Sequence, residues 1–154
     1  MELGLGPFQK QMSAFTTIPL YSDSRHLVVS PRHARYPQMV RGDARALKLT
    51  PLITSALDNP DMRPSILRLR DQFSTVWEVN SLSLRVHMVA EGMGVTFIDR
   101  KLLEENPVCS DFHIMDDVSF GSIAKQVGLY YRAGKQLSAS AGNFIALCER
   151  FWSL

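Results

Sequence analysis

The segment Glu91–Asp99, EGMGVTFID, constrains the fold more than any other part of the chain. It follows a stretch whose residues predict a helix from about Leu82 to Glu91, so Gly92 stands where a left-handed glycine commonly ends a helix. Residues Gly94–Ile98 are mostly apolar or β-branched, which predicts a buried strand. The segment therefore predicts a helix that turns sharply into a strand of the core.

The same two glycines could be read as a phosphate-binding loop. A dinucleotide fingerprint requires Gly-x-Gly-x-x-Gly after a strand and before a helix, so that helix amides point at the pyrophosphate. Here the glycines follow a helix and precede a strand, and the third glycine is absent. The nearby helix end is the carboxyl end, whose partial negative charge repels phosphate. We interpret Gly92 and Gly94 as a structural corner.

The rest of the chain alternates between the two kinds of element, which indicates the α/β class. Strands are predicted in MELGLGPF at the start and at Arg25–Ser30, Pro51–Thr54, Thr75–Val79, Phe112–Met115 and Lys125–Arg132. Further helices are predicted as one turn near Asp43–Leu47, at Pro64–Phe73, after Asp99 through RKLLEE, and at Leu137–Trp152 with Ser138 or Ser140 as its cap. Leu82, Val86, Val89 and Met93 form the apolar stripe expected to bury the central helix.

Composition and charge limit the classes of function. The 154 residues carry 17 basic and 15 acidic side chains, a balance too even to indicate nucleic acid as a partner. No apolar run approaches the roughly 18 residues of a membrane span, and the N-terminus lacks the pattern of a signal peptide. Two cysteines, Cys109 and Cys148, form no Cys-x-x-Cys motif, so we expect a reduced, cytoplasmic protein without membrane contact.

Polar residues follow two of the predicted strands. Asn80 and Ser81 stand between a strand and a helix, where free amides and short polar side chains can hold a ligand. Thr54 and Ser55 follow another strand, and their hydroxyls can grip a small anion or carbonyl. Both pairs have ordinary alternatives, a helix cap and a turn with local hydrogen bonds, and the residues alone favour these alternatives without excluding a ligand site.

Catalytic and metal-binding patterns are absent from the sequence. The four histidines, at 26, 33, 87 and 113, are scattered, and no Cys or carboxylate cluster completes a metal site. No Gly-x-Ser-x-Gly motif or acid/base pair is recognisable. We expect neither an enzyme nor a cofactor.

The order of several short segments resembles the effector-binding domain of LysR-type transcriptional regulators. The resemblance is carried by ELGLGP, SRHLVVSPRH, LTPLITS, EVNSLSLRVHMVAEGMGVTFIDRKLLEE and VGLYYRAGKQLSASAGNFIALCERFW. Each piece is weakly specific, but they occur in the family's order over nearly the whole chain. Asp99 departs from the family, which often has proline there. The family's helix-turn-helix region and the first strands of the effector domain do not match any part of this sequence.

The resemblance implies an α/β, periplasmic-binding-protein-like type II fold in which the second lobe is complete and the first lobe is partial. Residues 1–24 would form a first-lobe strand and crossover, 25–98 the second lobe, and 99–154 the crossover back, a first-lobe strand and the C-terminal helix. A small effector would lie in the cleft between the lobes. The implied second-lobe contacts are Thr54, Ser55, Asn80, Ser81, Thr96 and Phe97.

The expected function is that of a ligand-sensing regulatory domain, truncated at its N-terminus and lacking the DNA-binding helix-turn-helix. Its partners would be a small polar or anionic effector and further copies of itself, through a homodimer or higher oligomer or through strand exchange between copies. DNA would be reached only through a helix-turn-helix domain outside this chain. The alternatives are a fragment of a solute-binding protein and an enzyme on the same two-lobed scaffold.

Overall fold

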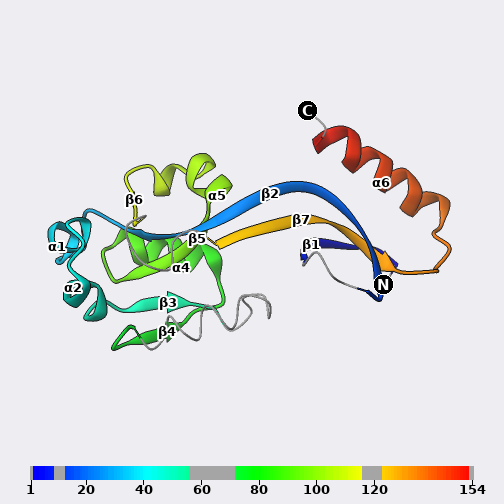
Figure 1. Cartoon of the computed structure of the whole chain (residues 1–154). Helices are drawn as coiled ribbons and strands as arrows, with labels where there is room; N and C mark the ends of the chain where they lie inside the picture. The colour runs from blue at the N-terminus through cyan, green and yellow to red at the C-terminus, as the bar shows by residue number, and fades with distance from the viewer. Residues whose placement is uncertain (1, 9–12, 56–71, 116–122, 153–154) are drawn as a thin grey trace. The chain divides into compact units, whose positions relative to one another are not determined.

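The structure, a computed structural model, describes residues 2–8, 13–55, 72–115 and 123–152 (Figure 1). Contacts divide the chain into two compact units. Unit 1 contains Met1–Asp23 and Ala124–Leu154, and unit 2 contains Ser24–Ile123. Among the described residues, 99–115 therefore belong to unit 2. The predicted helix at Pro64–Phe73 falls mainly on residues outside the described ranges.

The sheet of unit 2 combines parallel and antiparallel strands. Its order is β2 (Phe15–Val29, of which residues 24–29 belong to this unit), β5 (Val95–Asp99), β3 (Leu52–Thr54) and β4 (Val76–Glu78). β3 is parallel to both β4 and β5, whereas β2 is antiparallel to β5 and to β6 (His113–Ile114). The predicted strands in this unit are confirmed.

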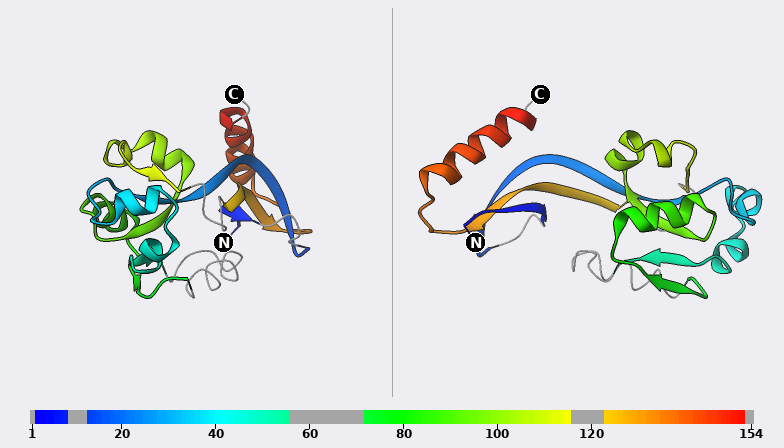
Figure 2. Two further views of the ribbon diagram at one scale, coloured as in Figure 1. Left: turned by 60° about the vertical axis from the view of Figure 1, so that its left-hand side comes forward. Right: turned by 180° about the vertical axis from the view of Figure 1, so that it is seen from behind.

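Alternation along these strands divides the core of unit 2 between two faces of the sheet. One buried cluster contains Leu27, Val29, Val95 and Phe97 and is covered by Met39, Ala46 and Leu47 from α1 (Tyr36–Val40) and α2 (Ala44–Lys48). The other contains Val28 and Ile98 and is covered by Val86 of α4 (Leu82–Ala90). Figure 2 shows α4 lying across the sheet of this unit.

The segment between β2 and β3 contains two short helices rather than the single turn that we predicted. The helical turn near Asp43 is confirmed as α2, and the Asp43 carboxylate accepts bonds from the amides of Arg45 and Ala46. α1 was missed because Pro37 suggested a break, yet proline is tolerated in the first turn of a helix.

The corner that ends α4 is confirmed in detail. Gly92 has φ +74°, its amide donates to Val89, and the Met93 amide donates to Met88, the pattern of a Schellman motif. A Cβ on Gly94 would lie 2.5 Å from the carbonyl oxygen of Pro51, so the position just before β5 requires glycine.

Only two of the four side chains predicted to form the apolar stripe of α4 are buried. Val86 and Val89 are buried, but Leu82 and Met93 are 42% and 45% exposed, and Arg85 is buried instead. Leu82 is the first residue of α4, and Met93 lies past the helix end.

After β5, the short helix α5 (Arg100–Glu105) and a 3₁₀ turn (Pro107–Cys109) lead to β6. Asp99 occupies the N-cap position of α5, as predicted, but its carboxylate makes no capping bond.

Unit 1 contains β1 (Gly4–Phe8), β7 (Ile123–Arg132, all but its first residue), the first part of β2 and α6 (Ala139–Trp152), with strand order β1-β7-β2. The Ser138 hydroxyl accepts from the amide of Ala141, so the predicted cap of the terminal helix is confirmed. Trp152 at the other end of α6 stacks on Tyr21 of β2, with ring centroids 5.8 Å apart.

Candidate functional site

The carboxyl ends of three parallel strands meet at one edge of the unit 2 sheet. Thr54 at the end of β3 pairs with Glu78 at the end of β4, and Ile53 pairs with Thr96 of β5. Thr54-Ser55 and Asn80-Ser81 therefore reach the same edge, as expected for polar residues that follow neighbouring parallel strands.

A side-chain hydrogen bond joins the two pairs. The Ser55 hydroxyl donates to the Asn80 side-chain oxygen over 3.1 Å, and the Val79 amide donates to the Thr54 carbonyl over 2.8 Å. Thr54 and Ser55 are buried, whereas Asn80 and Ser81 are exposed. The two candidate segments thus form one continuous polar edge with a buried floor and an exposed rim.

Ser81 fixes the direction of α4 at this edge. Its hydroxyl accepts from the Leu84 amide at 3.3 Å, and its carbonyl accepts from the Arg85 amide at 3.0 Å. The first amides of a helix have no acceptor within the helix, and their partial positive charge favours an anion or an electron-rich oxygen. The cap and the possible ligand site are therefore the same place, which is why the sequence could not separate them.

Thr96 and Phe97 lie deeper in the sheet. Thr96 is fully buried, and its hydroxyl donates to the carbonyl of Ile53 over 2.6 Å. The Phe97 side chain belongs to the buried cluster on the α1–α2 face. Within the described residues, both side chains hold β5 in place, and their contact with an effector stays a prediction.

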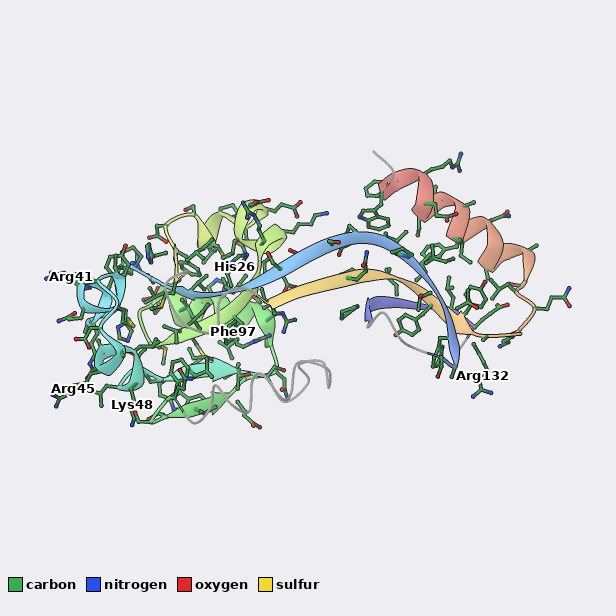
Figure 3. The ribbon with its side chains drawn as sticks, in the orientation of Figure 1. His26, Arg41, Arg45, Lys48, Phe97 and Arg132 are labelled. Carbon is green, nitrogen blue, oxygen red and sulfur yellow. The ribbon has the colours of Figure 1, made fainter. Side chains whose placement is uncertain are left out.

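Sequence reasoning missed three polar residues at the same end of the sheet. β2 runs antiparallel to β5, so Arg25 pairs with Asp99 and His26 with Ile98. The Arg25 Nε donates to the Asp99 carboxylate over 2.7 Å, which explains why that carboxylate does not cap α5. His26 is buried, and its Nε2 lies 2.7 Å from the Ser24 hydroxyl (Figure 3). The polar run Ser24-Arg25-His26 before an apolar strand was the available signal.

Both cysteines are free and buried, and they belong to different units. Burial, reinforced by the nearby Asp111 carboxylate, raises the pKa of the Cys109 thiol and so favours its protonated, unreactive form. Among the described residues, no group of three or more His, Cys, Asp or Glu side chains is arranged to hold a metal ion. No helix within the described ranges is long and apolar enough to cross a bilayer.

Comparison with known families gives one match, to the family described as LysR substrate binding domain, over residues 1–153. No curated protein sequence is significantly similar to the chain.

Solved structures of regulatory domains share the fold at low sequence identity. The bromide-bound regulatory domain of HypT from Salmonella typhimurium is 14% identical with a TM-score of 0.73, covering 99% of this chain and 72% of that one. The CcmR regulatory domain of Synechocystis PCC6803 in complex with 2-PG is 16% identical with a TM-score of 0.70, covering 98% and 73%. A sulfate-bound OxyR2 regulatory-domain mutant from Vibrio vulnificus is 16% identical with a TM-score of 0.68, covering 97% and 70%.

Proposed function

The chain belongs to the family of LysR substrate-binding domains, and we propose that it senses a small polar or anionic effector at the polar edge formed by Thr54-Ser55 and Asn80-Ser81. Domains of this family are non-enzymatic parts of transcription regulators, with the mixed α/β fold seen here. The proposal therefore concerns what the domain binds and where.

The observation that carries the proposal is the hydrogen bond between Ser55 and Asn80 beside the capped start of α4. It holds two segments from different strands in one arrangement before any ligand arrives, which lowers the ordering cost of binding. The adjoining helix start adds amide donors and a positive end of the helix dipole.

The chemistry of this edge favours an electron-rich ligand. Hydroxyls, a carboxamide and helix amides donate hydrogen bonds to carboxylate, phosphate or sulfate oxygens without any need to titrate. The similar structures of HypT, CcmR and the OxyR2 mutant carry bromide, 2-PG and sulfate, respectively. We extend this preference for small anions to the present chain.

Four further features of the expected sensor domain are also part of the proposal. They are effector contacts by Thr96 and Phe97, an effector cleft between a complete second lobe and a partial first lobe, self-association into homodimers or higher oligomers, and a cytoplasmic location. DNA contact would belong to a helix-turn-helix domain outside these 154 residues.

Sulfate is the first probe, titrated by calorimetry and thermal shift against sodium chloride at equal ionic strength. Excluded salts stabilise many proteins without binding, so only a saturable effect that depends on named residues counts. We expect Asn80→Ala to bind sulfate about tenfold more weakly, the effect of losing roughly one hydrogen bond to a charged group. Ser55→Ala should weaken sulfate binding by a smaller factor, because it removes the hydroxyl that holds the Asn80 carboxamide in place. A panel of small carboxylates and phosphorylated acids, tested in the same way, would then rank the effector class.

The matched control is Ser83→Ala, which removes an exposed hydroxyl from the first turns of α4 without changing the Ser55–Asn80 contact. If the Ser55→Ala and Asn80→Ala variants bound sulfate with wild-type affinity and kept their melting temperatures, the sulfate site would lie elsewhere. An equal loss of sulfate affinity in the Ser83→Ala variant would show that the substitutions disturb α4 as a whole and do not remove a specific ligand contact.

A further inference from the structure

A cavity lies wholly within unit 1, and it shares no lining residue with the polar edge of unit 2. Its volume is about 540 Å³, within the range of roughly 300–1,000 Å³ that is usual for small-ligand sites. It opens where β1 begins and β7 ends, and its main lining side chains are Glu2, Phe15, Tyr130, Tyr131, Arg132 and Lys135.

Aromatic rings form a fixed wall of this cavity. Gly4 of β1 pairs with Tyr130 of β7, and the Tyr130 ring covers the glycine so closely that a Cβ there would overlap the ring. Phe15 meets the same ring edge to face, with centroids 6.0 Å apart and an interplanar angle of 87°. Strand pairing and the second ring therefore hold Tyr130 in place, and they present a flat apolar surface to a ligand.

The charged side chains around that surface favour an anion. Two cations, Arg132 and Lys135, line the cavity against one carboxylate, that of Glu2. The Glu2 carboxylate is already engaged, because it accepts from the amide and hydroxyl of Ser138 over 2.6 and 3.0 Å. These bonds to Ser138, with Lys135 nearby, lower the pKa of Glu2 and keep it ionised.

Arg132 and Lys135 form no ion pair within 4 Å among the described residues. Arg132 ends β7, as labelled in Figure 3, and a short turn joins it to Lys135, whose amide donates to the Arg132 carbonyl over 3.2 Å. The two cations are therefore held close together in the chain, beside the aromatic wall, and are available to an external carboxylate.

We propose that this cavity is a second ligand site, for a small aromatic carboxylate. The ring of the ligand lies against Tyr130 and Phe15, and its carboxylate pairs with Arg132 and Lys135. The proposal does not depend on the effector site of unit 2, because the two share no residue.

Benzoate is the probe, titrated into the full chain by calorimetry, with ring resonances followed by NMR. We expect saturable binding and shifts of the Tyr130 and Phe15 rings. Benzamide lacks the charge and acetate lacks the ring, so each should bind at least about tenfold more weakly. An Arg132→Gln, Lys135→Gln double variant should lose affinity by a similar factor, whereas Arg150→Gln, which removes an exposed cation of α6 outside the cavity, should bind as the wild type does.

Four results would overturn the proposal. They are no binding of benzoate at millimolar concentrations, wild-type affinity in the double variant, inorganic phosphate or acetate binding as tightly as benzoate, and loss of benzoate binding in Ser55→Ala. A Tyr130→Leu variant tests the aromatic wall separately. It should weaken benzoate binding while circular dichroism and the melting temperature show that the chain still folds.

Discussion

At the scale of single residues, Thr96 shows how a candidate ligand contact can also be part of the core. Its hydroxyl is fully buried and donates to the Ile53 carbonyl over 2.6 Å, which ties β5 to β3 beside the polar edge. A buried carbonyl that loses its donor costs about 1–3 kcal/mol, because water cannot replace the bond. The residue therefore stabilises the frame of the site whether or not it touches an effector.

We predict that Thr96→Val lowers the free energy of unfolding by about 1–3 kcal/mol, because valine keeps the shape but not the hydroxyl. Urea denaturation measures this change. Thr75→Val, at an exposed position just before β4, is the matched control and should change stability by less than about 0.5 kcal/mol. An unchanged stability with weakened sulfate binding would instead assign the Thr96 hydroxyl to the ligand.

At the scale of elements, the corner between α4 and β5 sets the position of the polar edge. Ser81 begins the helix and Gly92 ends it, so both ends of α4 are fixed by local chemistry. β5 then enters the sheet between β2 and β3. A substitution that distorts this corner should therefore displace β5 and the strand ends that form the polar edge.

Substitutions at Gly92 and Gly42 distinguish two destabilising effects of a side chain, backbone strain at positive φ and steric overlap with a neighbour. Both have positive φ, +74° and +80°, which costs a non-glycine residue about 1–2 kcal/mol. A Cβ on Gly92 would also lie 2.7 Å from the Arg32 carbonyl oxygen, whereas a Cβ on Gly42 meets nothing within 4 Å. We predict that Gly92→Ala is the more destabilising of the two by at least about 1 kcal/mol, measured by urea denaturation. Equal losses of stability in the two variants would mean that the backbone near Arg32 shifts at little energetic cost.

At the scale of the whole molecule, α6 presents an apolar surface in unit 1. Phe144, Leu147 and Phe151 are exposed on it, Phe151 to 67%, while Ala141 and Cys148 face inward. Exposed apolar clusters of this kind are typical of interfaces, which supports the proposal that copies of the chain associate. The described part of unit 1 does not bury these three side chains.

We predict that the chain sediments as a dimer or larger species at low micromolar concentration, because association removes this apolar surface from water. A Phe144→Glu, Leu147→Glu double variant should shift the distribution toward monomer. Asn143→Glu adds a charge to an exposed position of the same helix without removing an apolar side chain, so it should leave the distribution unchanged. A wild-type chain that sediments as a monomer would contradict the proposal.

The sequence by itself determined the features that depend on neighbouring residues. Ser81 and Ser138 were predictable as caps because a cap bonds amides two or three residues away, and Gly92 was predictable because a helix end needs a left-handed residue. The pattern of strands and polar residues placed Thr54-Ser55 and Asn80-Ser81 at two strand ends, and the resemblance of ordered segments identified the family.

Only the tertiary structure decided which distant side chains meet. The Ser55–Asn80 bond, the Arg25–Asp99 ion pair and the burial of Arg85 all depend on how strands and helices pack together. The cavity of unit 1 depends on the register that places Tyr130 opposite Gly4. Local patterns fix the ends of elements, because caps and turns act over a few residues. Pairing across the sheet fixes the sites, because their parts come from segments far apart in the chain.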